Sequence, residues 1–595
     1  MATLKIGRKA LVPALVLLGL TLGLWGIGWG LPSHGRLARV LPPGLDGLGF
    51  QKELADSWGA MHQELGENLM VNPKSFGTFT GVVEIKSGWK KPPKELLNSY
   101  RSFYVRSEHE DEQSILLALS RMKPRQLQFK PHLFTYGALH IYSVGAALAL
   151  GALSGLVTLK SSILFYLADP AQMAAMYMAG RLLSVAAFVA CGLMLLRLGR
   201  LSLGSVEAGG LAAAIFLMTP AAVVQAHVLK NHTFWSFFAL WTVDRCALVL
   251  KRGALKDYAA AGAVAGLTTA SFLGAWPACL VVGTAGAMRL AGLHEPNGRP
   301  RRPLPELQGL LLAGLCAGTA FLLVSPYWIV DFGEAMREMT VLSGFGALDL
   351  AHPWLFVTHA LRRSVTDPVL TLMFGGTALA LLKGRREPVL LLCALAFLLA
   401  LASTATVGNV LSTRQARYFL GWIAIGSLLA GRLLVELRAL KGPAGRFGTA
   451  TAAIVLAGLA CRGLAYAHNF SLGAGDRSTH SLSGEWIEKN IVEGSVIGLL
   501  RYPQPSNSPF FRYDRYRLMF IEPKLAPTLP SAKLPRYLAL TIPDYDDRPA
   551  LAPILAHYDL LASFPRGKLF PWIEIESTST TANPLIEIYR LKGKA

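Results

Sequence analysis

Charged residues are scarce in this chain of 595 residues, at 16% of the total, whereas soluble domains contain about 25%. Hydrophobic residues make up 52%, and the mean hydropathy is +0.40. These figures exclude a chain that is mostly a water-exposed globule, and they do not fit a disordered or collagen-like protein. The sequence also contains no heptad pattern, internal repeat or low-complexity tract.

Cysteine is equally scarce, and its placement excludes a disulfide framework. The six cysteines are Cys191, Cys246, Cys279, Cys316, Cys393 and Cys461. All of them lie in or at the edge of apolar runs, and none falls in the two long polar stretches. No pair has the spacing of a zinc site. We interpret them as small core residues.

Acidic residues are few as well, with 37 Asp and Glu against 58 Lys and Arg, which gives a net charge of +21. A basic balance usually indicates nucleic acid or an anionic surface as the partner. Here the apolar excess favours a membrane protein whose positive charge lies in cytoplasmic loops. We therefore expect membrane lipids, and no nucleic acid, as partners.

Long apolar runs are the most prominent feature that is present, because a spanning helix needs about 20 apolar residues. The first run, 10–31, is too long for a signal-peptide core and has no clear cleavage site. Since Lys5, Arg8 and Lys9 precede it, we interpret it as an uncleaved anchor with a cytoplasmic N-terminus. Further spans are predicted at 181–199, 208–226, 233–250, 257–273, 275–290, 308–325, 365–382, 388–405, 416–433 and 448–466.

The prediction is therefore a mainly α, polytopic membrane protein of about 11–13 transmembrane helices, with a small extracytoplasmic C-terminal α/β domain. The range is open because 134–157 and 161–179 either span the membrane as a pair or lie on its surface. The loops predicted to be cytoplasmic are almost all basic, as the positive-inside rule requires. They contain Arg197 and Arg200; Lys251, Arg252 and Lys256; Arg289, Arg299, Arg301 and Arg302; Lys383, Arg385 and Arg386; and Arg438, Lys441 and Arg446.

Two polar regions then face the non-cytoplasmic side. The predicted division is an anchor helix at 1–31, a first outer loop with juxtamembrane or embedded helices at 32–180, a multi-span core at 181–466 and the outer domain at 467–595. The outer domain contains a helix-like stretch at 485–490 and β-like runs at 496–500, 537–542 and 585–589, which indicates a small α/β domain. Strong basicity, a short N-terminal segment and the lack of an ER-retention signal suggest a bacterial inner membrane.

The densest acidic cluster is Glu108-His109-Glu110-Asp111-Glu112, in the first outer loop. One interpretation is a solvated helix N-terminus, where carboxylates offset the helix dipole. The other is a general base, with or without a metal ion, at the membrane surface, because carboxylates and histidines are common metal ligands. The aromatic-rich run 129–137 follows the cluster.

The tetrad 109–112, followed by that aromatic-rich run, resembles the first outer loop of membrane glycosyltransferases of the GT-C class. The resemblance is strongest to the protein-mannosyltransferase-like branch, glycosyltransferase family 39 and its relatives. It rests on the order and sidedness of several landmarks rather than on one motif. These are Arg181-Leu182-Leu183-Ser184, Thr219-Pro220, Ala226-His227, Lys230-Asn231-His232, the run 325–332 and Arg417-Tyr418.

The resemblance implies a hexosyl- or pentosyltransferase that takes its sugar from a polyprenyl-phosphate donor. The acceptor hydroxyl would attack the anomeric carbon of the donor sugar on the non-cytoplasmic face, with inversion at that carbon. This hydroxyl belongs to a glycan, a lipid or a protein, which the sequence does not identify. The first-loop aspartate of such enzymes is the catalytic base, which corresponds to Asp111 here, with Glu112 beside it as a second catalytic candidate. A carboxylate is suited to this role because an attacking hydroxyl must lose its proton.

The resemblance also suggests how the phosphate of the donor is held. Candidate phosphate-binding residues are Arg181, Arg417, His227 and Lys230. The alternative for each arginine is an interfacial side chain that snorkels to the membrane surface, and for His227 an interfacial polar role.

A divalent cation, Mg or Mn, would be held by Asp111 and His232, although the site is equally compatible with metal-free chemistry. The sequence departs from many relatives at Asn231-His232, where they have an acidic residue, and at 269–272, where a lysine is often found.

Two other functions remain open. A transporter or lipid flippase would have ionisable groups near the membrane midplane, but the spans are nearly free of Asp and Glu, with Asp244 as the main exception. A catalytically degenerate relative that binds lipid or an assembly partner is suggested by the altered 231–232 pair. The lysine-bearing segment 40–100 shapes the acceptor site or packs on the tail. Asp544, Asp546 and Asp547 are interpreted as an exposed turn after Pro543, with cation binding as the alternative.

Overall fold

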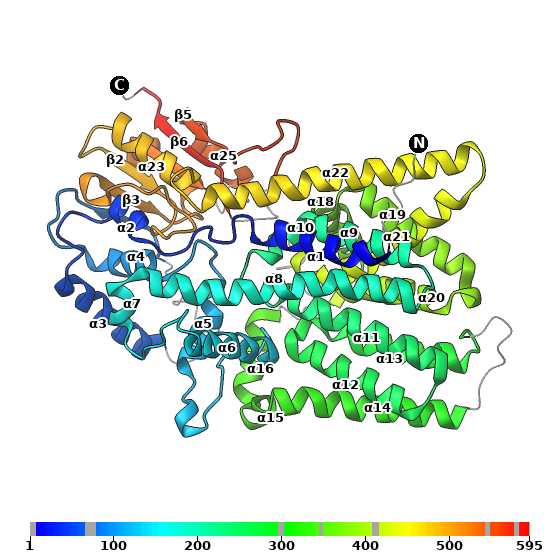
Figure 1. The fold of residues 1–595 in the computed structure, drawn as a ribbon. Coiled ribbons are helices and arrows are strands. Elements are labelled where there is room, and N and C mark those ends of the chain that lie inside the picture. Colours follow the sequence, from blue (N-terminus) through cyan, green and yellow to red (C-terminus); the bar gives the residue numbers. More distant parts are fainter. Residues whose placement is uncertain are drawn as a thin grey trace. The chain divides into compact units, whose positions relative to one another are not determined.

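The computed structural model describes residues 8–65, 79–294, 303–343, 349–406, 416–541, 548–575 and 582–593. The chain divides into two compact units, each described by itself. Unit 1 comprises Met1–Trp25, Arg121–Ala147 and Gly180–Ala467, and unit 2 comprises Gly26–Ser120, Leu148–Ala179 and His468–Ala595. Figure 1 shows the helices and strands with the labels used below. Asp544, Asp546 and Asp547, for which the sequence predicts an exposed turn, lie outside the described residues.

Unit 1 is built almost entirely from apolar helices. Its helices, some of which extend into unit 2, are α1 (Arg8–Leu24), α6 (Ala138–Leu153), α8 (Pro170–Leu201), α9 (Val206–Met218), α10 (Pro220–Ala226), α11 (His232–Arg252), α12 (Leu255–Ser271), α13 (Pro277–Leu290), α14 (Pro303–Val324), α15 (Tyr327–Val330), α16 (Phe332–Ser343), α17 (His352–Leu355), α18 (Arg362–Val365), α19 (Asp367–Lys383), α20 (Pro388–Ser403), α21 (Leu420–Ala439) and α22 (Pro443–Gly473). A π-helical turn, η5 (Phe356–Leu361), joins α17 to α18, and short 3₁₀ turns, η4 (Leu273–Ala275) and η8 (Ala416–Phe419), precede α13 and α21. The predicted polytopic, mainly helical fold is confirmed.

Seven helices in the described part of the chain are long and apolar enough to cross a membrane, or up to nine if each of two bent pairs is one span. Each predicted span coincides with a helix, except that 208–226 covers both limbs of the bent pair α9 and α10 and 365–382 matches one limb, α19, of the other pair. The helix of the first predicted span, α1, and the helix at 257–273, α12, are shorter. The chain is therefore a multi-pass integral membrane protein.

The region between 134 and 179 was left open by the sequence. Residues 134–157 contain one apolar helix, α6. Residues 161–179 form no helix of their own, because they divide between the short α7 (Ile163–Ala168) and the first part of α8. Pro170 starts α8, as proline is favoured in the first helical turn, and no residue breaks the helix before Leu201.

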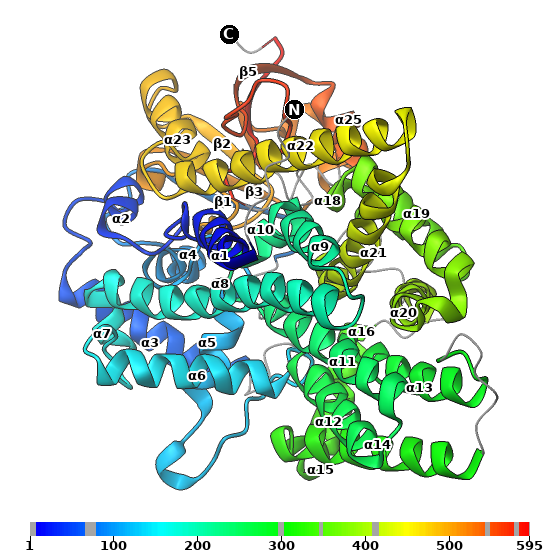
Figure 2. The same cartoon turned by 45° about the vertical axis from the view of Figure 1, so that its right-hand side comes forward.

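Small residues bring the helices of unit 1 together. Helices α11, α12, α13 and α14 lie side by side in both views (Figures 1 and 2). A side chain at Gly262 or Gly266 would collide with the backbone of Ala313 or Ala317 on α14. Within lipid, helices gain no hydrophobic free energy by associating, so this close van der Waals packing is what holds them together.

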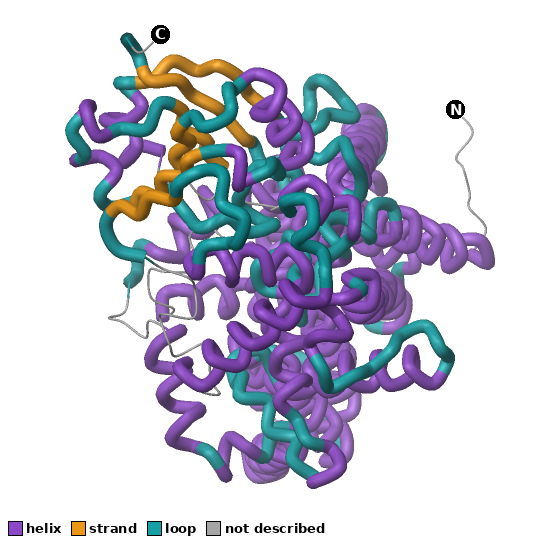
Figure 3. Tube along the Cα trace, turned by 90° about the vertical axis from the view of Figure 1, so that its left-hand side faces the viewer, coloured by secondary structure: helices purple, strands orange, loops and turns teal. Residues whose placement is uncertain are grey.

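Unit 2 contains a six-stranded mixed sheet with the strand order β1-β3-β2-β4-β6-β5. Figure 3 shows its strands in orange. The strands are β1 (Val82–Ile85), β2 (Val496–Leu499), β3 (Arg517–Ile521), β4 (Tyr537–Thr541), β5 (Tyr558–Phe564) and β6 (Ile586–Leu591). The three central strands run parallel, and the others are antiparallel to their neighbours. The helix α23 (Thr479–Asn490) and strands β2, β4 and β6 match the predicted stretches, which confirms a small α/β domain.

The first polar loop contributes directly to this domain. Strand β1 comes from that loop and pairs with β3 of the tail. The loop also forms α2 (His34–Val40), α3 (Leu48–Leu65), α4 (Lys94–Val105) and α5 (Glu112–Arg121), and the tail forms α25 (Arg548–Leu555). On α4, the ring of Tyr100 packs 6.4 Å from Tyr513 of the tail. The described part of the segment 40–100 therefore packs on the tail, while an acceptor-shaping role remains a prediction.

Candidate functional site

The loop that carries Asp111 begins where α4 ends, and Arg36 anchors it there. The last carbonyls of a helix have no partner within the helix. Arg36 supplies one, because its Nη2 donates to the carbonyl oxygens of Phe103 at 2.6 Å and Arg106 at 2.7 Å. Burial lowers the pKa of Arg36 to about 10, with the charge of Glu108 opposing the shift. The guanidinium thus stays charged and holds the start of the loop in place.

Within the acidic cluster, burial separates the carboxylates. The side chains of Glu108 and Glu112 are 3% and 0% exposed, whereas Glu110 is exposed and Asp111 is half-buried. Glu112 accepts a hydrogen bond from the Ser107 hydroxyl. A carboxylate enclosed in this way is less suited to receive a proton from a substrate than Asp111. Glu112, the last residue of the cluster, is the first residue of helix α5, so the cluster does lie at a helix N-terminus.

Residues of the tail hold the other side of this loop. The Ser506 hydroxyl donates to Glu110 Oε1 at 3.1 Å, and Arg106 Nη1 lies 3.4 Å from Gln504 Oε1. His480 is stacked on Phe510 with a ring separation of 4.8 Å. No local sequence signal marks these residues, because Ser506 and Glu110 are 396 positions apart.

In unit 1, a short turn between α10 and α11 carries several of the predicted phosphate-binding residues. The Lys230 ammonium lies 3.7 Å from the centre of the Tyr136 ring, a cation–π contact. The neighbouring Asn231 donates from Nδ2 to the carbonyl oxygens of Tyr136 at 2.7 Å and Ser271 at 3.1 Å. Asn231 therefore fixes the turn that presents Lys230.

His227 is tied to the backbone. Its Nδ1 lies 2.8 Å from the Val223 carbonyl oxygen, and its Nε2 lies 3.0 Å from that of Trp25. Burial lowers its pKa to about 4, the two backbone contacts oppose the shift, and the charge of Arg181 adds to it. Both ring nitrogens thus lie near carbonyl oxygens, and the neutral ring donates to only one of them at a time. A buried ring held in this way is better suited to fixing the end of α10 than to binding phosphate.

His232 and Arg417 meet around one tyrosine. The His232 ring contacts Tyr418 edge-on at 5.3 Å and Phe272 at 5.8 Å. Arg417 Nη2 lies 3.2 Å from the Tyr418 hydroxyl. Arg181 is fully buried in α8. Unit 1 therefore contains all the predicted phosphate-binding residues and His232, while Asp111 and Glu112 belong to unit 2.

A charged cluster that the sequence did not predict lies on the segment after the first-loop motif. Lys130 Nζ contacts Glu334 Oε2 at 2.6 Å and Asp331 Oδ1 at 3.1 Å. The buried Glu338 accepts from the backbone N–H groups of Phe134 and Thr135. Asp331, which directly precedes α16, thus pairs with Lys130.

The metal hypothesis can be tested against the donor atoms present. No group of three His, Cys, Asp or Glu side chains able to hold a metal ion occurs among the described residues. Asp111 and His232, the two predicted ligands, lie in different units. Among the described residues, the His, Cys, Asp and Glu side chains thus form no three-ligand cation site.

Comparisons with known proteins give remote structural likenesses. No family model and no curated protein matches the chain. The oligosaccharyltransferase AglB from Archaeoglobus fulgidus, in complex with an inhibitory peptide and a dolichol-phosphate, has a TM-score of 0.40 and 10% identity over 93% of this chain and 73% of its own. The same organism's oligosaccharyltransferase with Zn and sulfate has a TM-score of 0.37 and 13% identity over 71% of this chain, which spans 62% of it.

A second protein, ArnT from Cupriavidus metallidurans bound to undecaprenyl phosphate, has a TM-score of 0.38 and 13% identity over 81% of this chain and 93% of its own. TM-scores this low describe a remote likeness and assign no function by themselves. These solved structures are of the GT-C class of membrane glycosyltransferases, the class that the sequence resembles, and none of them tests the protein-mannosyltransferase-like branch.

Proposed function

We propose that this protein is an integral-membrane glycosyltransferase that moves a sugar from a polyprenyl-phosphate donor to an acceptor hydroxyl on the non-cytoplasmic face. Asp111 is its general base. The observation that carries the proposal is the sorting of the acidic cluster, in which Asp111 stays accessible while Glu108 and Glu112 are buried. A loop anchored by Arg36 and Ser506 is pre-organised, as a proton acceptor must be.

The reaction is a single displacement. The acceptor oxygen forms a bond to the anomeric carbon, while the bond from that carbon to the phosphate oxygen of the donor breaks. The hydroxyl proton passes to the Asp111 carboxylate, and the polyprenyl monophosphate leaves with the bonding electrons. Attack opposite the leaving group inverts the anomeric centre. Asp111 then releases its proton to water.

The leaving phosphate gains negative charge, and cationic side chains lower the barrier by stabilising it. Arg417 and Lys230 are the unit 1 side chains proposed to contact the phosphate. Lys230 is held by the Tyr136 ring and Arg417 by the Tyr418 hydroxyl, so both cations are positioned by neighbouring tyrosines. Arg181, buried in α8, adds positive potential.

The test replaces the base and compares it with its exposed neighbour. Asp111→Asn has the same shape but accepts no proton, so transfer should fall about 100- to 10,000-fold, the usual contribution of a general base. Glu110→Gln, one residue away, should retain transfer within a few-fold. Mass spectrometry of lipids that co-purify with Asp111→Asn should show a trapped polyprenyl-phosphate sugar, which identifies the donor. Undiminished transfer by Asp111→Asn removes the proposed base.

One observation weighs against the transporter alternative. Asp244, the acidic residue noted within a span, pairs with Arg197 at 3.1 Å and also with Arg245. A carboxylate neutralised by two arginines is a structural ion pair rather than a site that loads and releases an ion.

A further inference from the structure

One buried carboxylate binds the backbone of segment 129–137, the aromatic-rich run that follows the acidic cluster. Glu338 of α16 is fully buried. Its Oε1 accepts from the backbone N–H of Thr135 at 2.9 Å and from the Thr135 hydroxyl at 2.7 Å. Both of its oxygens also lie 3.0 Å from the backbone nitrogen of Phe134. Since hydrogen bonds to a carboxylate are about twice as strong as neutral ones, this one side chain fixes two consecutive peptide units.

The start of the same segment is supported from α15. The backbone N–H of Phe129 donates to the Tyr327 hydroxyl at 3.0 Å, and the carbonyl of Phe129 accepts from the Tyr142 hydroxyl at 3.0 Å. The ring of Trp328 packs edge-on against Phe134 at 5.9 Å. The contacts of α15 and α16 therefore extend from residue 129 to residue 135, and they leave the next residue of the segment to meet the phosphate-site turn.

That next residue, Tyr136, holds Lys230. The Lys230 ammonium lies 3.7 Å from the centre of the Tyr136 ring, and the Tyr136 carbonyl accepts from Asn231 Nδ2 at 2.7 Å. Lys230 is only 3% exposed, so its position depends on these neighbours rather than on solvent. Because Thr135 and Tyr136 share a peptide bond, the carboxylate of Glu338 that fixes Thr135 also restricts the backbone from which the Tyr136 ring projects.

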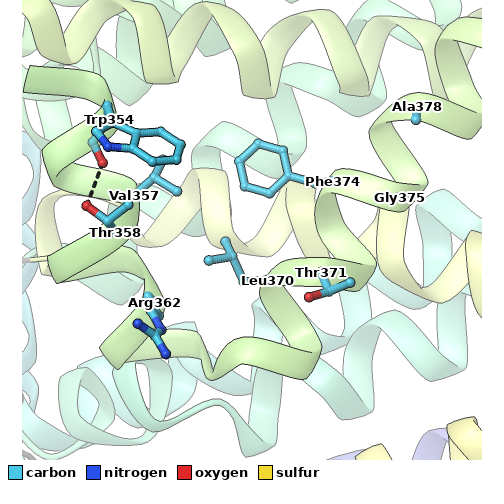
Figure 4. A pocket seen from close by; sticks show the side chains of 9 residues that line it. All are labelled: Trp354, Val357, Thr358, Arg362, Leu370, Thr371, Phe374, Gly375 and Ala378. Atoms are coloured by element: carbon cyan, nitrogen blue, oxygen red, sulfur yellow. Dashed lines mark hydrogen bonds between the residues drawn. The ribbon is translucent and has the colours of Figure 1, made fainter. Parts of the chain in front are cut away.

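A groove elsewhere in unit 1 contains no comparable cation for a phosphate. It lies between the helix limbs 352–365 and 367–386, whose axes turn by 118° at Thr366, and it has a volume of about 580 Å³ (Figure 4). Arg362 is the cation among its lining residues, and Asp367 binds that guanidinium through two hydrogen bonds of 2.6 and 2.9 Å. Its charge is thus already matched by a carboxylate, whereas the described contacts of Lys230 include an aromatic ring.

We propose that Glu338 is a positioning residue for Lys230, an inference that rests on the proposed function, in which Lys230 contacts the phosphate of the donor. Glu338 fixes residues 134–135, and the Tyr136 ring then holds the Lys230 ammonium where the leaving phosphate gains charge. A cation fixed in advance stabilises that charge without reorganising during the reaction. The competing explanation is that Glu338 serves only the stability of the fold, by satisfying buried backbone N–H groups.

The test removes the carboxylate and, separately, one of its contacts. Glu338→Leu is similar in size but accepts no hydrogen bond, and Glu338→Gln keeps one acceptor oxygen. Thr135→Val loses only the hydroxyl donor and keeps its β-branched shape, so it carries the test if Glu338→Leu does not fold. Glu306→Gln is the matched control, because Glu306 is also buried in unit 1 and its carboxylate binds Arg289 and Tyr258 instead.

The first measurement follows the position of Lys230 itself and requires no activity. Acetylation by an amine-reactive anhydride, located by peptide mass spectrometry, should be slow at Lys230 in the unmodified protein, because the side chain is buried. Glu338→Leu should accelerate it at least about five-fold, by freeing the segment that covers Lys230. Thr135→Val should accelerate it less, and Glu306→Gln should leave it unchanged. Unchanged protection in both Glu338→Leu and Thr135→Val overturns the inference.

The second measurement is the affinity for polyprenyl monophosphate, in a double-mutant cycle with Lys230→Met. Glu338→Leu should raise Kd about ten-fold when Lys230 is present, as small displacements of a binding group do. It should hardly change Kd in the Lys230→Met protein, because no ammonium is left to position. Glu338→Gln should have a smaller effect, and Glu306→Gln should lower Tm but not affinity. Equal effects of Glu338→Leu in both backgrounds mean that it acts through the fold alone, which overturns the inference.

The inference and the proposed function fail in different ways. If Lys230→Met by itself binds polyprenyl monophosphate as tightly as the unmodified protein, Lys230 does not contact the phosphate, and that part of the proposed function falls together with the inference. If Lys230→Met weakens binding while Glu338→Leu and Thr135→Val do not, only the positioning role of Glu338 falls. The KM for a polyprenyl-phosphate sugar, measured with the same variants, should follow the order of the Kd values.

Discussion

The Nε2 atom of His480 lies 4.0 Å from the Oε2 atom of Glu108, and both side chains are buried. Burial lowers the pKa of His480 to about 4, the hydrogen bond to the Ser508 carbonyl opposes the shift, and the charge of Arg36 adds to it. The ring is therefore neutral near pH 7, and the contact with Glu108 is not a salt bridge. It joins the tail to the loop that carries Asp111 by packing.

This neutral histidine makes the stability of unit 2 depend on pH. The unfolded chain binds a proton at His480 below pH of about 6.5, whereas the folded protein resists doing so down to about 4. The free energy of unfolding is therefore at its full value above the pKa of His480 in the unfolded chain. It falls by about 3 kcal/mol as pH drops through this window. We expect the melting temperature to decline between pH 7 and 5, and to decline less in His480→Gln. An equal decline in both proteins contradicts the prediction.

The Ser506 hydroxyl keeps the carboxylate of Glu110 on the tail side of the loop. In Ser506→Ala that carboxylate is released next to Asp111, and a nearby like charge raises the pKa of a carboxyl group. We expect the acidic limb of the pH profile of kcat/KM to move upward by about half a pH unit. Ser506→Thr retains the hydroxyl and should restore the original limb. An unshifted profile in Ser506→Ala argues against positioning by the tail.

Gly137 has φ +81°, and an added Cβ would collide with the carbonyl group of Ser271. Gly155 has a similar φ of +75° but open space around it, so a substitution there measures the backbone strain without a collision. We expect Gly155→Ala to destabilise the protein by about 1 kcal/mol. Gly137→Ala should cost about 2 kcal/mol more, because the collision also displaces the turn held by Asn231. Melting temperatures of the two variants provide the comparison, and similar values for both exclude the collision as a cause.

Glu334 is held by Lys130, whose Nζ lies 2.6 Å from Glu334 Oε2, and by His132, whose Nδ1 lies 3.0 Å from Glu334 Oε1. Burial alone would raise the pKa of Glu334, but these hydrogen bonds outweigh it and lower the pKa below its ordinary value of 4.5. The stabilisation is therefore present above that ordinary value and is lost as pH falls through the lowered one. Glu334→Gln should cost about 1–2 kcal/mol near pH 7, and the difference from the unmodified protein should shrink at lower pH.

The control for Glu334→Gln is the exposed pair of Lys91 and Glu53, at 3.2 Å. Because solvent screens such a pair, Glu53→Gln should change stability by less than about 0.5 kcal/mol. Thermal unfolding of both variants at several pH values is the measurement. If Glu53→Gln loses as much stability as Glu334→Gln, the contacts of Glu334 with Lys130 and His132 stabilise the protein no more than an exposed ion pair does.

Within unit 2, the sequence and the structure agree where the signal is local. The runs that became β2, β4 and β6 were visible as apolar, β-favouring stretches, because strand propensity reflects neighbouring residues. Strand β1 was not visible, since its partner β3 lies more than 400 positions along the chain. Ser506 and Gln504 are also far in sequence from the acidic loop that they contact, so no local pattern in that loop predicts them.

Composition and periodicity alone determined that this protein crosses a membrane many times and ends in a small α/β domain, because a backbone in lipid must satisfy its hydrogen bonds within long apolar helices. Only the tertiary structure decided which carboxylate of the acidic cluster remains reachable, which tail residues hold its loop, and where a helix bends at Thr366. Those outcomes depend on contacts between distant segments, and burial and pairing across such distances follow from packing rather than from neighbouring residues.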